Sequence, residues 1–253
     1  MKVTFLGTGT SQGVPVIGCH CEVCQSLDYR DKRLRSSVFI EVDSQCIVVD
    51  TGPDFRQQML RERIEKLDFV LFTHSHKDHT AGLDDVRAFN FKQHMDMPLY
   101  GTSQVLKQLK TEYYYAFLEK KYPGTPQLQL NEINHEAFQV NGVSITPLPV
   151  THLYMPVFGF RIKDFSYITD ANSIPDTTID LLKGTTTLVL NALQRDPHIS
   201  HFNLQEAIQM AGKIGARKTY FTHISHKLGL HKQVAAELPE NIELAYDGLT
   251  IPA

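Results

Sequence analysis

The sequence has no excess of charge of either sign. Its 25 lysines and arginines stand against 28 aspartates and glutamates, which gives a formal net charge of −3 over 253 residues. A surface that holds long nucleic acid needs many basic side chains to meet the phosphates. The balance therefore argues against long nucleic acid as a partner and leaves a small anionic substrate open.

Long hydrophobic runs are missing as well. No stretch approaches the roughly 18 apolar residues that a membrane span requires. The N-terminus, MKVTFLGTGTSQG, has one lysine and a short apolar run, which is not the layout of a signal peptide. We therefore expect no signal peptide and no membrane partner.

Cysteine is scarce, with four residues in all, three of them within CHCEVC. So few thiols cannot form a sensible disulfide framework in a protein of this size. A chain of this length can also bury a substantial core, so its fold does not depend on a metal. We expect a cytoplasmic protein whose thiolates are reserved for metal.

Short apolar runs rich in Val, Ile and Phe alternate with amphipathic stretches, and they predict strands and helices respectively. Pro53 suits a first helical turn, and Asn203 with Glu206 has capping-box spacing. The segment YPGTPQLQ (122–129) is interpreted as a seam between two halves of one domain, residues 1–253. The predicted strands are 2–7, 37–42, 46–50, 68–73, 143–150, 157–162, 165–169, 186–191 and 218–222, and the predicted helices are 53–64, 103–122 and 203–214.

A cluster of metal-ligating side chains follows the predicted strand 68–73. Residues 74–79 read H-S-H-K-D-H. On a tight turn after a strand, such side chains can converge, and imidazole with carboxylate suits zinc or manganese. Four ligands this close cannot all bind one ion comfortably. A second ion and further ligands are therefore implied.

Three further candidate ligands, His152, Asp170 and His223, each follow a predicted strand. Singly, each is more often a cap or a surface residue. In this order after H-x-H-x-D-H, however, they resemble the metallo-β-lactamase superfamily over nearly the whole chain, and VVDTGPD (48–54) is similar to that family's aspartate-bearing strand end. The resemblance implies an α/β fold, a four-layer αββα sandwich with a dinuclear site at the shared edge of two similar halves.

Carried over residue by residue, the resemblance implies two zinc or manganese ions. Asp78 is expected among the catalytic residues as well as among the ligands. Asp50, at the end of the strand 46–50, is interpreted as orienting the site without binding an ion. The implied ligands are His74, His76 and His152 for one ion, Asp78, His79 and His223 for the other, and Asp170 as the bridge.

Two ions about 3.5–4 Å apart suit the hydrolysis of a phosphodiester. They bring the pKa of a bridging water toward neutrality, which makes a bridging hydroxide the nucleophile, and they draw negative charge from the phosphate oxygens. The alkoxide leaving group still needs a proton donor. Histidines 198 and 201, just before a predicted helix, offer that proton.

The segment HISHFNLQEA (198–207) resembles the H-x-S-H-x-N motif of one branch of the superfamily, which contains the phosphoribosyl cyclic phosphodiesterase. The resemblance implies that His201 faces the metal-bound phosphate as the proton donor. His198 is interpreted as a cap or a first-turn packing residue of the following helix.

The three cysteines of CHCEVC can supply three corners of a tetrahedral zinc site. For the fourth corner, Cys46 opens a buried run, where cysteine usually behaves as a small hydrophobe. His226 lies three residues after His223, and the same branch has a structural zinc with a histidine at this place. We therefore expect one structural zinc on Cys19, Cys21, Cys24 and His226.

Other residues are less specific. Arg87 suits either a phosphate contact or a solvated helix face. The three tyrosines 113–115 suit a sugar or base pocket, a homodimer contact or a local core. The backbone amides of residues 8–11 are expected near the substrate. The histidines without a partner pattern, interpreted as surface or loop residues, are His20, His94, His135 and His231.

The leading function is the hydrolysis of small or cyclic phosphodiesters, such as a ribose cyclic phosphate or a cyclic nucleotide. A tRNA 3′-processing endonuclease shares the dinuclear motif but calls for a glycine- and proline-rich basic arm, and none is evident. A thioester hydrolase of the glyoxalase II type also shares it, but nothing favours a glutathione site. A non-catalytic binding protein, as in pyrroloquinoline quinone biosynthesis, has a similar CxCxxC, yet the intact ligands at 74–79 argue against it.

Overall fold

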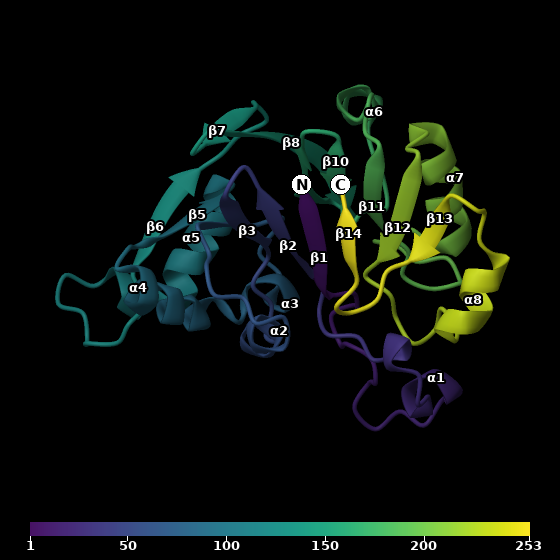
Figure 1. Cartoon of the computed structure of the whole chain (residues 1–253), viewed down its shortest axis with the longest axis horizontal. Coiled ribbons are helices and arrows are strands. Elements are labelled where there is room, and N and C mark those ends of the chain that lie inside the picture. The colour runs from purple at the N-terminus through teal and green to yellow at the C-terminus, as the bar shows by residue number, and fades with distance from the viewer.

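Two seven-stranded sheets pack face to face and carry helices on their outer faces (Figure 1). The structure, a computed structural model, describes residues 1–253. In spatial order the first sheet contains β14 (Thr250–Pro252), β1 (Lys2–Gly7), β2 (Ser37–Val42), β3 (Gln45–Val49), β4 (Phe69–Leu71), β5 (Met97–Gly101) and β6 (Leu128–Glu132). The second contains β13 (Ile242–Leu244), β12 (Lys218–Thr222), β11 (Thr187–Asn191), β10 (Phe165–Tyr167), β9 (Met155–Ile162), β8 (Val143–His152) and β7 (Phe138–Val140).

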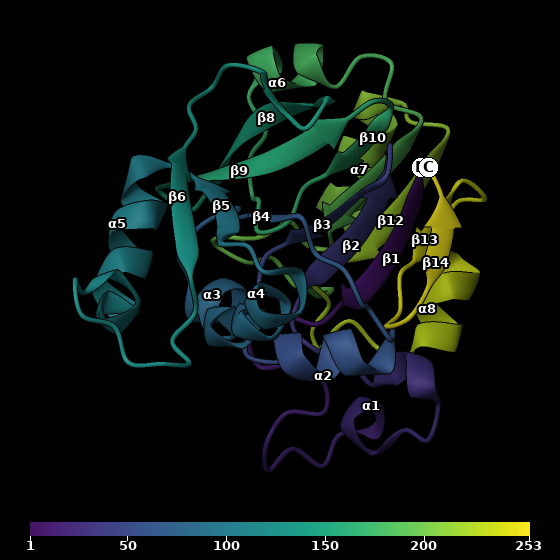
Figure 2. The same cartoon turned by 60° about the vertical axis from the view of Figure 1, so that its left-hand side comes forward.

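Helices cover the outer face of each sheet, which confirms the predicted αββα sandwich. A short helix, α1 (Glu22–Gln25), belongs to neither layer and stands below the sheets in both views (Figure 2). The first sheet carries α2 (Phe55–Arg61), α3 (Lys77–Thr80), α4 (Arg87–Gln93) and α5 (Ser103–Glu112). The second carries α6 (Asp176–Leu181), α7 (Leu204–Ile214) and α8 (His231–Glu237). Three short 3₁₀ helices complete the chain, η1 (Tyr29–Asp31), η2 (Leu83–Val86) and η3 (Tyr114–Phe117).

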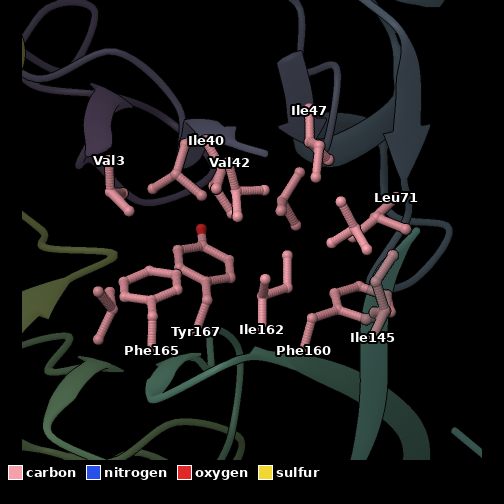
Figure 3. Packing of buried hydrophobic residues seen from close by; sticks show 14 of the residues in the cluster. Val3, Ile40, Val42, Ile47, Leu71, Ile145, Phe160, Ile162, Phe165 and Tyr167 are labelled. Atoms are coloured by element: carbon pink, nitrogen blue, oxygen red, sulfur yellow. The ribbon is translucent and has the colours of Figure 1, made fainter. Parts of the chain in front are cut away.

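Three apolar cores correspond to the three contacts between these four layers. The central core lies between the sheets, where Ile40 and Leu71 of the first face Phe160 and Tyr167 of the second (Figure 3). A second core joins the outer face of the second sheet to α6, α7 and α8, and a third joins the first sheet to α2, α4 and α5. Each sheet is thus buried on both faces, which explains why the predicted strands read as nearly continuous apolar runs.

Most predicted strands match the structure, but two expectations were wrong. The helix predicted for 103–122 ends at Glu112, because the weak helix formers that follow are aromatic and Tyr113 donates its hydroxyl hydrogen bond to the carbonyl oxygen of Thr80 instead. The predicted seam at 122–129 runs into β6, which begins at Leu128 and pairs in parallel with β5. The chain crosses between the sheets later, between Glu132 and Phe138.

No helix of the structure has the length and apolar character needed to cross a membrane.

Candidate active site and metal clusters

The predicted ligands gather at one edge of the sandwich. Residues 74–79 follow β4 and run into α3, while His152 ends β8 and His223 directly follows β12. In Figure 1 this is the lower edge, where α3 and the loop bearing α1 lie, and α6 lies at the opposite edge. Segments more than a hundred residues apart in the sequence therefore contribute to one centre.

Three residues of this centre have left-handed backbone conformations. Asp50, Asp170 and His223 have φ angles of 66°, 53° and 55°. Each follows the end of a strand, and all three side chains are buried. Aspartate and histidine tolerate this region better than most residues, yet it still costs about 1–2 kcal/mol each. The local backbone thus turns sharply at the expense of stability.

Asp170 is the hub of the centre. Its Oδ1 lies 3.0 Å from Nε2 of His201, and its Oδ2 lies 3.2 Å from both Nε2 of His79 and Nδ1 of His223. Burial disfavours the charged carboxylate, but His223 and His79 hold its pKa well below the usual value. Burial also lowers the pKa of His223 to about 4, so its imidazole is neutral at pH 7, the form that binds metals.

Two clusters of potential ligand atoms share Asp170, and within each cluster the atoms lie within 4.8 Å of one another. This is the relation expected of a bridging carboxylate. His74 and His76 flank the second cluster, since their ring centroids lie 5.9 and 5.2 Å from that of His152. The first cluster is Asp78, His79, Asp170 and His223, and the second is His152, Asp170 and His201.

Asp50 orients two of the candidate ligands. Its Oδ2 lies 2.7 Å from Nδ1 of His79 and also accepts a hydrogen bond from Oγ1 of Thr73, at 2.8 Å. Because that hydroxyl proton is used, Oγ1 of Thr73 accepts from Nδ1 of His74, 2.9 Å away. An acceptor at Nδ1 fixes the proton there and leaves the Nε2 lone pair for an ion. The geometry is that of the orienting role expected for Asp50.

The donor set fits metal ions. The Nε2 atoms of His74 and His79 are buried and make no hydrogen bond. A buried polar atom without a partner costs about 1–3 kcal/mol, and two cations in this centre, one at each imidazole, would satisfy both atoms. His152 is held in the same way, because its Nδ1 lies 2.8 Å from the carbonyl oxygen of Ser200, which leaves its Nε2 free.

His201 lies deeper in the centre than its predicted role requires. Its ring stacks on that of His223 with centroids 4.9 Å apart and contacts that of His152 edge-on at 4.5 Å. Only 8% of its surface is exposed. Since it shares a cluster with Asp170, the position suits a metal ligand as well as a proton donor.

The interpretation of His198 as a helix cap was wrong. Asn203 caps α7, and it forms the predicted capping box with Glu206. His198 instead lies beside the centre, where its Nδ1 is 3.3 Å from Nδ1 of His201 and 3.3 Å from Oγ of Ser200. The histidine pair is therefore a feature that the sequence pattern suggested and the helix interpretation missed.

The cysteine cluster forms a second centre. Nδ1 of His226 lies 3.3, 3.4 and 3.5 Å from the sulfur atoms of Cys19, Cys21 and Cys24. In a tetrahedral zinc site with ordinary bond lengths, nitrogen and sulfur ligands are about 3.6 Å apart. Cys46 lies elsewhere, in β3. The structure thus brings together the four residues expected to hold zinc, and metal binding by them stays a prediction.

The pKa values of two thiols in this cluster are shifted in opposite directions. The backbone amide of Cys24 donates to Sγ of Cys21 and lowers the pKa of that thiol to about 6. Burial raises the pKa of Cys24 to about 11. A cation is therefore needed for all the thiols to be deprotonated together at neutral pH.

A glycine allows the close contact between the loop after β3 and the H-x-H-x-D-H motif. A Cβ atom on Gly52 would lie 2.2 Å from the backbone oxygen of Asp78. On either side, the amide of Thr51 donates to the carbonyl oxygen of His79, and the amide of Gly82 donates to that of Thr51. The glycine of VVDTGPD therefore lets the loop that carries Asp50 lie directly against the motif.

The less specific residues have ordinary contacts. Arg87 pairs with Asp84, whose carboxylate also accepts the hydroxyl of Tyr115. Tyr113 is buried, whereas Tyr114 is exposed. The amides of residues 8 and 9 donate to Oδ1 of Asp247 and to the carbonyl oxygen of residue 34, and that of residue 10 donates to the carbonyl oxygen of residue 224. Their approach to a substrate stays a prediction.

Comparison with known proteins places this geometry in a family. Residues 45–224, more than half of the chain, match the family described as a beta-lactamase superfamily domain. All residues of the two histidine–aspartate clusters lie within this segment. A solved structure described as a new diphosphatase from the PhnP family is 42% identical with a TM-score of 0.93, and the match covers 99% of this chain and 96% of that one.

Two curated relatives have different names. An octanoyltransferase of Porphyromonas gingivalis (strain ATCC BAA-308 / W83) is 40% identical over 252 residues, 98% of this chain and 51% of the relative. A ribonuclease Z of Macrococcus caseolyticus (strain JCSC5402) is 28% identical over 179 residues, 68% of this chain and 53% of the relative. The chain spans about half the length of these relatives. By its matched segment and its H-x-H-x-D-H motif, the chain belongs to the beta-lactamase superfamily, and it is similar over its whole length to a PhnP-family protein.

Proposed function

We propose that the chain is a metal-dependent hydrolase of small phosphodiesters, with ribose cyclic phosphates and cyclic nucleotides as candidate substrates. The observation that carries the proposal is the pair of ligand clusters that share the buried carboxylate of Asp170. Two divalent ions held there, zinc or manganese, would draw negative charge from a phosphate and supply an activated water. Membership of the superfamily supports the coarser statement, a metal-dependent hydrolase.

The side chains of the chain would divide the remaining work. We propose that His74, His76, His152, Asp78, His79, His223 and Asp170 are the metal ligands. Asp50 and Thr73 hold two of these imidazoles in the tautomer that can bind an ion. His201 donates a proton to the leaving oxygen, since its Nε2 borders the shared carboxylate. General acid catalysis of this kind typically contributes about 10²–10⁴ in rate.

A second candidate is the hydrolysis of a diphosphate ester. The PhnP-family structure described as a diphosphatase is the observation that favours it. The same clusters serve both reactions, but the leaving group then is a phosphate. A phosphate is a weaker base than an alkoxide and needs less help from a proton donor. The two reactions should therefore differ in their dependence on His201.

The name octanoyltransferase belongs to a relative about twice as long as the matched segment. Clustered histidines and carboxylates are the ligands of metal-dependent hydrolysis. The clusters of this chain therefore favour hydrolysis over acyl transfer.

An activity screen of the metal-reconstituted protein tests the proposed function. We expect turnover of bis-aryl phosphodiesters and of at least one ribose cyclic phosphate, cyclic nucleotide or diphosphate diester. Asp170→Asn keeps the shape of the side chain and removes its charge, so this control should lose the activity. Turnover of thioesters alone, or of no phosphate ester, would contradict the proposal.

Metal content is a separate prediction. We expect three ions per chain by elemental analysis, two at the histidine–aspartate clusters and one zinc at the cysteine cluster. The reason is the spatial separation of the two ligand sets. Cys46→Ser is the matched control and should retain three ions. One ion or none after reconstitution would count against the assignment.

A further inference from the structure

Two apolar side chains stand exposed beside the polar centre. Tyr154 is 91% exposed and lies in the two-residue turn that joins β8 to β9, directly after His152 and Leu153. Ile199 is 74% exposed and lies two residues before His201. Both residues therefore lie within two positions of a histidine in the second cluster, which is His152, Asp170 and His201.

A hydrogen-bonded brace holds the two loops together. The side-chain oxygen of Asn172 accepts from the amide of Leu153 at 2.8 Å, and its Nδ2 donates to the carbonyl oxygen of Ile199 at 3.2 Å. The contact between His152 and the carbonyl oxygen of Ser200 adds a second tie. These hydrogen bonds hold together the two loops that carry the exposed side chains.

Single exposed apolar residues are common on protein surfaces and carry no meaning alone. Here two of them occur on braced loops that also carry members of one cluster. A phosphate bound at the clusters would hold its ester groups near the two loops that carry these side chains. An aromatic group can stack on a tyrosine ring, and the two rings then bury apolar surface that would otherwise face water.

We propose that Tyr154 and Ile199 form a rim that receives a planar aromatic ester group of the substrate, the one that does not leave, while the phosphate lies at the clusters. The inference rests on the proposed function and names the part of the substrate that the rim selects. Asn172 acts as a positioning residue, since it contacts both loops through their backbone.

Two diesters with the same leaving group test the rim. Bis(4-nitrophenyl) phosphate carries a second aryl group, and methyl 4-nitrophenyl phosphate does not. We expect Tyr154→Ala and Ile199→Ala each to raise KM for the bis-aryl ester by about 10-fold. Neither variant should change kcat, or KM for the methyl ester. Tyr122→Ala, at a tyrosine 81% exposed between α5 and β6, is the control and should change nothing.

Equal changes for both diesters, or no change for either, would overturn the rim. A second measurement does not depend on turnover. The chain contains no tryptophan, so Tyr154→Trp places a single indole at the rim and Tyr122→Trp places one at the control site. We expect phenylphosphonate to shift the emission of Tyr154→Trp saturably, and methylphosphonate to leave it unchanged.

No response of Tyr154→Trp to phenylphosphonate, or the same response in Tyr122→Trp, would overturn the inference. If the wild type hydrolyses no diester but Tyr154→Trp responds to phenylphosphonate alone, the proposed function fails and the rim stands. If the diesters are hydrolysed and the indole is silent, the rim fails alone.

Discussion

His201→Ala should slow the hydrolysis of a cyclic ribose phosphate by about 10²–10⁴-fold, the range of general acid catalysis. An alkoxide is a poor leaving group until it is protonated, and we propose His201 as the side chain that supplies this proton. A nitrophenolate is a much weaker base and leaves unaided. The same substitution should therefore slow an activated aryl diester far less. Steady-state kinetics on the two substrates measure the asymmetry.

The position of His201 in the cluster with His152 and Asp170 makes metal content the essential accompanying measurement. A proton donor can be removed without loss of ions, whereas a ligand cannot. His198→Ala is the matched control, because this imidazole lies beside His201 but is exposed. Equal losses on both substrates, or departure of the metals, would assign His201 as a ligand or a phosphate-positioning group.

Cys21→Ser should remove the zinc of the cysteine cluster and lower the melting temperature by about 10 °C. Structural zinc contributes about 10–16 kcal/mol to the folding of small zinc-finger peptides. If zinc adds about a third of that free energy here, its loss lowers the melting temperature by roughly 10 °C, because each kcal/mol shifts the melting temperature of a domain of this size by about 2–4 °C. Calorimetry and elemental analysis on the same sample give both quantities.

Cys46→Ser provides the comparison for this variant. It removes a thiol from β3, outside the cluster, and should leave the zinc in place. If the two variants melted alike and held equal zinc, the cysteine cluster would have no structural role. Loss of zinc without loss of stability would separate binding from folding, since it would show a bound ion on which the fold does not depend.

The centre was predictable because its residues occupy local patterns. The candidate ligands of the H-x-H-x-D-H motif lie within six consecutive residues, 74–79, and His152 and His223 each end or directly follow an apolar strand. An apolar strand with a polar, metal-ligating end can be recognised without knowledge of its neighbours. The same holds for α7, whose capping box is written in four consecutive residues.

Apart from Asp50, the residues that orient the candidate ligands could not be predicted in this way. Thr73 and Ser200 fix the tautomers of His74 and His152, yet threonine and serine occur in every loop. Only their position against an imidazole gives them a role. His231, expected at the surface, is buried where Nη2 of Arg33 lies 3.2 Å from its Nδ1, a contact across 198 positions.

Long-range pairing is the other part that local patterns do not contain. β14 lies beside β1, so the last residues of the chain complete the sheet that the first residues begin. The loop after β1 is also held by a residue near the C-terminal end, because Asp247 accepts hydrogen bonds from both the amide and the hydroxyl of Thr8. These contacts depend on the finished fold and not on any nearby signal.

The left-handed backbone at Asp50, Asp170 and His223 has a consequence for laboratory evolution. Glycine adopts this conformation freely, so at each of these sites a glycine would relieve torsional cost that the native side chain imposes. The buried contacts of Asp50 and Asp170 oppose this gain, since their loss would leave buried imidazoles without partners. A glycine that raised heat tolerance here would also destroy the centre. Stabilised versions of this protein should therefore be sought with turnover of the proposed substrates as a second criterion, and with these three positions held constant.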